Sequence, residues 1–294
     1  MDLDSFLTEL YVMIDTWWQA QPVVPQPGRP PRLSPSEALT LAVVAQWPRW
    51  RSERDFWRYA DRHLRGVFPT LPGQSQLNRR IRRAEPHLRA MQAALAAHLT
   101  EPTAGYHLLD TTLIPAIQRV RAERHGLFAG EAAFGRCAAK TAWVYGFKLG
   151  VTTDPAGVIT TFGVASPQTD ERPIGDALIA ADRFPVYLAD KGFAGREWEQ
   201  RWQARYGAYV AATPKRSDVR AWPDEMCRWA AGKRQLIEGV FDQLKDLFGL
   251  ERHRAKTIGG LLTRVAAKIL AYTCGQALNR HHARPLRQLA DLLI

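Results

Sequence analysis

The sequence predicts an α/β protein in which an all-helical N-terminal region precedes a mixed sheet flanked by helices. Up to about residue 100, apolar residues recur at helical spacing between proline and glycine breaks. After Pro102, short β-branched and aromatic runs alternate with helical patterns, which is typical of α/β domains. The chain has 294 residues, enough for two domains with separate cores. We therefore expect a helical domain over residues 1–100 and an α/β domain over residues 101–294.

Three segments of the N-terminal region carry clear helix signals. Leu3–Trp18 has an apolar stripe at helical spacing, and the proline-rich stretch from Pro22 to Pro31 ends it. Ser34-Pro35-Ser36-Glu37 is a capping box with proline at the first helical position, so a second helix begins there. Ser52 and Asp55 begin a third helix.

The next predicted helix, Ser75–Arg83, is strongly basic. Four arginines surround Leu77 and Ile81: Arg79, Arg80, Arg82 and Arg83. Such a cluster either contacts the phosphates or a groove of DNA, or is only a solvated helix face. The whole chain has 40 Lys and Arg against 29 Asp and Glu, a formal net charge of +11, which favours a polyanionic partner. Nucleic acid is therefore the first candidate ligand, and a helix-turn-helix is an open alternative for this region.

Other features of the composition exclude some classes of protein. No apolar stretch approaches the roughly 20 residues that cross a bilayer, so we expect no membrane segment. The N-terminus lacks the basic, then apolar, then small-residue pattern of a secretory signal, which favours a cytoplasmic protein. The three cysteines lack metal-ligand spacing, so we expect reduced thiols.

The C-terminal region is predicted to alternate strands and helices. A turn at Asp154-Pro155-Ala156-Gly157 predicts a hairpin between two of the strands. Two long helices, Lys233–Phe248 and Ile258–Leu278, and a short apolar helix after Pro285 close the chain. In order, the expected strands are Tyr106–Asp110, Trp143–Thr152, Val158–Val164, Pro185–Asp190 and Tyr209–Ala212, with helices at Pro173–Ala181 and Arg196–Arg205.

Two acidic residues lie where predicted strands end. Asp110 follows one apolar strand and Asp190 follows another, and ligand sites in α/β folds lie at such ends. Two carboxylates there can share a cation. A single strand-end aspartate is more often a turn former or a helix cap, so a third ligand is needed to support a metal site.

The helix Lys233–Phe248 supplies a candidate third ligand. At 100° per residue, Arg234, Glu238 and Lys245 fall within a sector about 40° wide, beside the apolar stripe. All three side chains can therefore face one edge of a site. On spacing alone, an exposed Arg–Glu pair at i,i+4 is the simpler interpretation.

The three acidic segments together resemble the DDE transposases of bacterial insertion sequences, whose catalytic core is similar to ribonuclease H. Leu109-Asp110-Thr111-Thr112 resembles the family's first aspartate segment, and Ala189-Asp190-Lys191-Gly192-Phe193 resembles the second. Arg234, Glu238 and Lys245 match the signature Tyr-x2-Arg-x3-Glu-x6-Lys, with Ala231 where tyrosine is usual. Residues 33–41 and 141–149 look most like the insertion-sequence 982 group, within the insertion-sequence 4/5-like superfamily.

The resemblance implies a chemistry and a set of partners. Asp110, Asp190 and Glu238 would hold two Mg²⁺ or Mn²⁺ ions for cleavage and strand transfer, and carboxylates are the ligands that Mg²⁺ prefers. DNA would be contacted by Lys191, Arg234 and Lys245, in addition to the four arginines of the basic helix. The partners would be double-stranded DNA, at the element ends and the target, and a second copy of the chain. Three alternatives stay open: a related metal-dependent nuclease, a transposase that now only binds DNA, and a helical scaffold protein.

Overall fold

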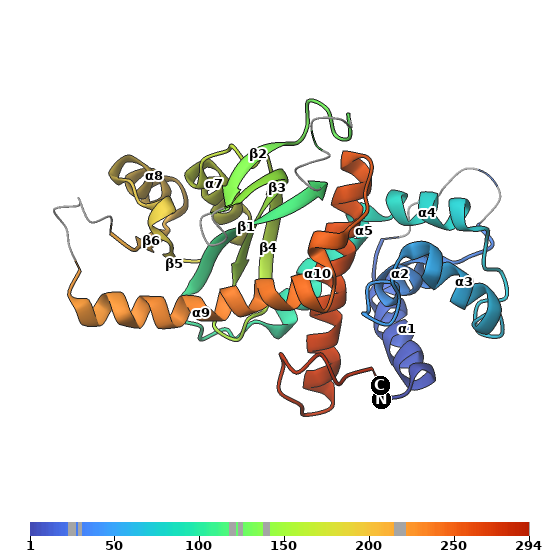
Figure 1. Ribbon diagram of the computed structural model, residues 1–294. Coiled ribbons are helices and arrows are strands. Elements are labelled where there is room, and N and C mark those ends of the chain that lie inside the picture. Colours follow the sequence, from blue (N-terminus) through green and yellow to red (C-terminus); the bar gives the residue numbers. More distant parts are fainter. Residues whose placement is uncertain are drawn as a thin grey trace. The chain divides into compact units, whose positions relative to one another are not determined.

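The computed structural model of the chain describes residues 1–22, 28, 31–117, 122, 126–137, 142–214 and 222–293. These residues form two compact units, whose elements are labelled in Figure 1. One unit comprises Met1–Leu95, Asp246–Gly249 and Gly259–Ile294, and the other comprises Ala96–Lys245 and Leu250–Ile258. Within the described ranges, no helix combines the length and apolar character needed to cross a membrane.

The first unit begins with helices whose ends follow their capping residues. The predicted capping box is confirmed, because the Ser34 hydroxyl accepts from the Glu37 N–H and the Glu37 carboxylate accepts from the Ser34 N–H. Ser52 caps the next helix as predicted. The helices are α1 (Leu3–Gln19), α2 (Pro35–Val44), α3 (Glu53–His63), α4 (Gln74–Arg83) and α5 (Glu85–Leu99), of which Glu85–Leu95 belong to this unit.

The C-terminal helix α10 (Ile258–His281) belongs almost entirely to this first unit, whereas the sequence had placed residues 259–294 with the α/β domain. Most of its residues are buried all round, so the helix is itself a core element. Buried Lys268 donates hydrogen bonds to the Phe248 carbonyl and to Gln46 Oε1, and burial lowers its pKa to about 8. The helical pattern was predicted correctly, and the structure shows that the helix packs within the first unit.

The prediction of a short helix after Pro285 is wrong. The described residues there form turns. Leu289 and Leu292 are buried, and both lie close to Gly275 of α10, where a Cβ would come within 2.8 Å of Leu289 Cδ2. Turns bring both leucines to α10, so burial overrides the weak helical pattern.

The second unit contains a mixed six-stranded sheet, which confirms the predicted α/β class. The hydrogen-bonded strands follow one another in the order β2-β3-β1-β5-β6. The sixth strand, β4, lies off this path and pairs with β3. Antiparallel pairing joins β3 to β1, β2 and β4, whereas β1, β5 and β6 run parallel. The strands are β1 (His107–Ile117), β2 (Ala133–Cys137), β3 (Ala142–Thr153), β4 (Ile159–Ala165), β5 (Val186–Ala189) and β6 (Tyr209–Ala212).

Two strands differ from the prediction. β1 continues past Asp110 to Ile117, because its second half pairs with the first half of β3. Pro115, which cannot donate to the ladder, lies at a register shift in that pairing. The sequence did not predict β2. The predicted hairpin is confirmed, since the Asp154 carboxylate accepts from the N–H groups of Ala156 and Val158.

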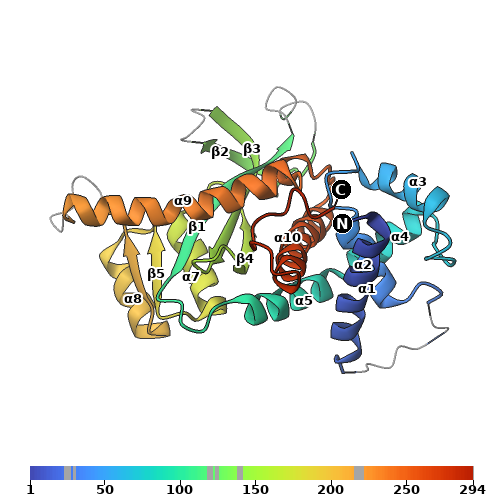
Figure 2. The ribbon, with the colours of Figure 1, turned by 90° about the horizontal axis from the view of Figure 1, so that it is seen from below.

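Helices cover the sheet and position its strand ends. The helix α7 (Glu171–Asp182) packs on β3 and β4 and contacts α8 (Arg196–Tyr206), and both contribute to a core around Tyr187 and Trp202. A short 3-10 turn, η1 (Lys191–Phe193), follows β5, and another, η2 (Leu250–Arg252), follows the long helix α9 (Asp224–Asp246). In Figures 1 and 2, α9 passes beside β1 and β5.

Candidate functional site

The pairing of two parallel strands brings Asp110 and Asp190 together. Leu109 of β1 is in register with Ala189 of β5, so the two aspartates follow at equivalent positions of neighbouring strands. Leu109 and Ala189 both face the core beneath α7 and α8. Because successive side chains alternate across a sheet, Asp110 and Asp190 both point to the opposite face. The two aspartates are therefore adjacent, but only Asp190 follows a strand end, because β1 continues past Asp110 to Ile117.

Arg234 of α9 lies between the two carboxylates. Its Nη2 is 3.5 Å from Asp110 Oδ2, and its Nη1 is 3.2 Å from Asp190 Oδ1. The side chain of Asp190 is 36% exposed, against 14% for Asp110 and 17% for Arg234, so the site opens on the Asp190 side. A guanidinium carries its donors in a fixed fork, which suits this bridging position.

The charge on Asp110 is costly in this structure. Burial, together with the nearby charges of Asp190 and Glu171, raises the pKa of Asp110 to about 6. Arg234 and a hydrogen bond from the Thr111 N–H, 2.7 Å from Asp110 Oδ1, oppose that rise. One guanidinium therefore does not offset burial and two neighbouring carboxylates, and a second cation would be favourable at this position.

Glu171, which the sequence analysis did not single out, is the third acid near Asp110. The Thr111 hydroxyl donates to Glu171 Oε1 at 3.1 Å. A Cβ on Gly192 would lie 1.4 Å from Glu171 Oε2, so glycine leaves room for this carboxylate beside the segment that follows Asp190. In the sequence, Glu171 looks like an ordinary acid in the first turn of a helix, so no local signal distinguishes it.

Glu238 is not brought into the aspartate pair. It lies four residues after Arg234 on α9, about 6 Å further along the helix axis, and it is exposed. In the part of the chain that is described, no group of three His, Cys, Asp or Glu residues is placed to hold a metal ion. The catalytic and metal-binding role of Glu238 stays a prediction. Lys245 is half-buried on the same helix, Ala231 is exposed, and Lys191 is exposed just after Asp190.

The four arginines of α4 lie in the other unit. Leu77 is the buried residue of this helix, and the arginines lie around the rest of its surface. Arg79, Arg82 and Arg83 are exposed, whereas Arg80 is half-buried and donates to the Leu33 carbonyl at 2.9 Å. Among the described residues, none of the four forms an ion pair with a carboxylate, unlike Arg65, Arg89 and Arg264 of the same unit. Their charge is therefore not neutralised by any carboxylate in the described part of the chain.

The raised pKa of Asp110 predicts how stability changes with pH in the presence of a chelator. The folded protein holds a proton on Asp110 up to about pH 6, whereas the unfolded chain releases it near the ordinary value of 3.8. The folded state therefore binds more protons between pH 4 and 6, and this group makes the free energy of unfolding fall as pH rises through that window. The expected loss is on the order of 2–3 kcal/mol. Urea titrations of wild type and Asp110→Asn across this window measure it, because the variant should lack this contribution. Parallel pH profiles of the two proteins would contradict the assignment.

Comparison with known proteins identifies the family of the α/β unit. None of the curated proteins matches the chain in sequence. A family described as "Transposase DDE domain" matches residues 100–258, which is more than half of the chain and includes Asp110, Asp190, Arg234 and Glu238. The matched segment covers the whole mixed sheet and the helix α9 that bridges its aspartates. The chain therefore belongs to the transposase DDE domain family.

Proposed function

We propose that this protein is the DNA transposase of a bacterial insertion sequence, which binds the element's terminal repeats and catalyses metal-dependent strand cleavage and strand transfer. The observation that carries the proposal is the pair of aspartates on neighbouring strands joined by Arg234 within a transposase DDE domain. A structural ion pair would not require two like charges on adjacent strands, one of them buried at a cost. The strand order, an antiparallel meander that continues into parallel strands, supports a ribonuclease-H-like core.

The aspartate pair fits a divalent cation in its donor chemistry. Both ligands are carboxylates, which Mg²⁺ and Mn²⁺ accept, and burial of Asp110 makes a further positive charge favourable. We propose that Asp110 and Asp190 hold the metal and that Glu238 completes the set from α9. Two bound Mg²⁺ ions would stabilise charge on the attacking and leaving oxygens of a phosphodiester. Arg234, whose buried Nε has no hydrogen-bond partner among the described residues, would orient the carboxylates or a DNA phosphate.

DNA contact is assigned to two sets of basic residues. Near the aspartates, Lys191 and Lys245 would contact the phosphates of the cleaved strand together with Arg234. In the helical unit, the α4 arginines would contact the terminal repeat, because they are basic, mostly exposed and without carboxylate partners in the described part of the chain. We therefore propose residues 1–100 as the DNA-binding domain, and α10, which lies in the same compact unit as residues 1–95, supports it from the core of that unit.

The finer assignments rest on the sequence motifs and on the chemistry of the reaction. The segments 33–41 and 141–149 favour the insertion-sequence 982 group. Transposition requires two DNA ends to be held together, so we propose a homodimer assembled on DNA. The protein would act in the cytoplasm at the nucleoid, where its substrate lies. A related nuclease would cut the same ends without joining them.

A cleavage assay with Glu238→Gln tests the proposal. Labelled DNA carrying the ends of the host element is incubated with Mg²⁺ or with a chelator, and the products are resolved on a denaturing gel. We expect wild type to cut at the ends only with metal, and Glu238→Gln to cut about 100-fold more slowly, because a carboxylate ligand has become a neutral amide.

Asp242→Asn is the matched control for that assay. Asp242 is also an exposed acid of α9, one turn beyond Glu238 and outside the signature. The Asp242→Asn variant should cut the labelled DNA at the wild-type rate. Cutting that stops at hydrolysis would favour a nuclease, and binding without any metal-dependent cutting would favour a protein that only binds DNA. Wild-type cleavage by Glu238→Gln would remove Glu238 from the site.

A further inference from the structure

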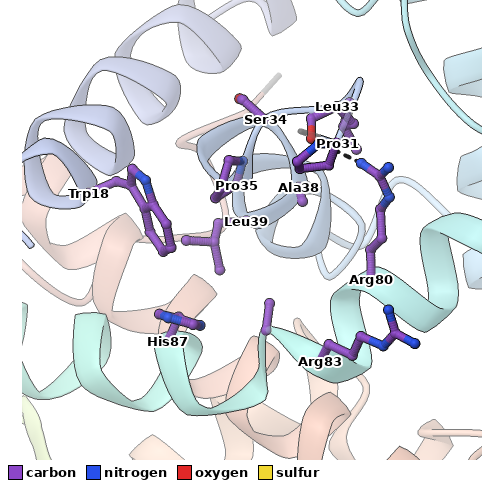
Figure 3. Close-up of a pocket in the computed structure, with 11 residues that line it drawn as sticks. Trp18, Pro31, Leu33, Ser34, Pro35, Ala38, Leu39, Arg80, Arg83 and His87 are labelled. Atoms are coloured by element: carbon purple, nitrogen blue, oxygen red, sulfur yellow. Dashed lines mark hydrogen bonds between the residues drawn. The ribbon is translucent and has the colours of Figure 1, made fainter. Parts of the chain in front are cut away.

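The helical unit contains a hollow that the catalytic site does not use. Its volume is about 240 Å³, just below the roughly 300–1,000 Å³ of pockets for drug-sized ligands, so it suits one small planar group. Four helices and the segment before α2 contribute to its wall, and Figure 3 shows how their side chains converge on it. The lining residues are Trp18, Pro31, Leu33, Ser34, Pro35, Ala38, Leu39, Arg80, Arg83, Ala84 and His87.

One side of the hollow is aromatic. Trp18, near the end of α1, and His87 of α5 have ring centroids 4.9 Å apart at an interplanar angle of 56°. Trp18 is only half-buried, so part of its indole face is accessible. Exposed aromatic faces bordering a basic surface are the platforms on which unpaired bases stack.

The opposite side is cationic, as Figure 3 shows for Arg80 and Arg83. The hydrogen bond from Arg80 to the Leu33 carbonyl fixes its guanidinium at the rim and leaves other N–H groups to donate. Arg83 is exposed. None of the described residues that line the hollow is acidic, and its charge therefore favours an anion.

The floor between these two sides is apolar. Leu33, Ala38 and Leu39 are all buried and line it. An occupant must therefore combine a flat, largely apolar body with a negative group at one edge. A nucleotide has this combination, because its base has two π faces and its phosphate is anionic. A paired base is stacked within the duplex on both faces, so only an unpaired base can place its ring in a hollow of this size.

We propose that this hollow binds a single unpaired DNA base, which stacks on Trp18 while its adjoining phosphate is neutralised by Arg80 and Arg83. The inference rests on the proposed function, since it assumes that α4 contacts DNA. It adds a preference to that function: the protein distinguishes DNA that is distorted or unpaired near the contact from a regular duplex. Such a preference would direct the protein to DNA ends, where bases leave the stacked duplex most easily.

Binding of two short labelled duplexes to the full chain tests this. One duplex is fully paired, and the other carries one extrahelical 2-aminopurine, whose fluorescence falls when it stacks on an aromatic ring. We expect wild type to bind the second duplex about 10-fold more tightly and to quench its emission. Trp18→Ala should lose the preference and the quenching and keep its affinity for the paired duplex, whereas Trp18→Phe should retain both.

Two further variants keep the result interpretable. Ala84→Leu narrows the hollow without removing Trp18, and it should abolish the preference even if Trp18→Ala folds poorly. Arg82→Ala changes an exposed arginine of α4 that does not line the hollow, and it should weaken binding of both duplexes equally. Equal binding of the two duplexes by wild type, or a preference that survives in Trp18→Ala and Ala84→Leu, would overturn the inference alone. Failure to bind either duplex would overturn it together with DNA contact by α4.

Discussion

Asp110→Asn is expected to abolish DNA cleavage, with a fall in rate of at least about 1,000-fold. The substitution keeps the shape of the side chain and removes the buried charge that would hold the metal ion. Loss of a metal ligand removes several kcal/mol of transition-state stabilisation, and about 4 kcal/mol corresponds to this factor. Because Asp110 is less exposed than Asp190 and borders Arg234, Thr111 and Glu171, we expect it to be the most sensitive of the three acids. Single-turnover cleavage with Mg²⁺ measures the effect.

The same variant should be more stable than wild type at pH 7 in the presence of a chelator. At that pH the carboxylate is charged although its pKa is raised to about 6, and asparagine removes this cost. Activity and stability would thus change in opposite directions, as expected where a site stores unfavourable charge. Asp61→Asn is the control, because Asp61 forms an exposed i,i+4 pair with Arg65 that contributes little. Cleavage by Asp110→Asn at the control's rate would remove Asp110 from the catalytic site.

Gly146→Ala is expected to destabilise the α/β unit by about 3 kcal/mol or more. A Cβ at this position of β3 would lie 2.0 Å from the Ile114 carbonyl oxygen and 2.8 Å from the Ala116 nitrogen. Both are backbone atoms of β1, which cannot move aside as the end of a side chain can. Overpacking usually costs about 1–3 kcal/mol, and a clash with backbone belongs at or above the upper end of that range. Chemical denaturation with urea, followed by circular dichroism, measures the loss.

Gly163→Ala is the matched control for this substitution. It places the same methyl group in β4, where the nearest atom is Leu178 Cδ2 at 3.8 Å, an ordinary contact. We expect its free energy of unfolding to lie within about 1 kcal/mol of wild type, since alanine also restricts the unfolded chain more than glycine does. Equal stability of Gly146→Ala and Gly163→Ala would show that the backbones of β1 and β3 move apart at this point to accommodate the methyl group. The β1 segment that carries Asp110 would then be more adaptable than its register suggests.

Most secondary structure could be predicted because its signals are local. The capping box at Ser34, the Asp154 turn and the apolar periodicity of α7, α8 and α9 depend on residues within a few positions of each other. β2 was missed because its strand conformation depends on β3 rather than on its own five residues. The turns after Pro285 were missed for a similar reason, since Leu289 and Leu292 are drawn to α10.

The sequence by itself determined the α/β class, the strands that carry Asp110 and Asp190, and the helix face that carries Arg234. Only the tertiary structure decided that Asp110 and Asp190 lie on one face of neighbouring strands, because register between segments far apart in the chain depends on the packing of the whole sheet. It also decided that Arg234 lies between them, that Glu171 approaches Gly192, and that α10 belongs to the helical unit. Each is a contact between distant residues, and helical or strand periodicity specifies which face is apolar without specifying what covers it.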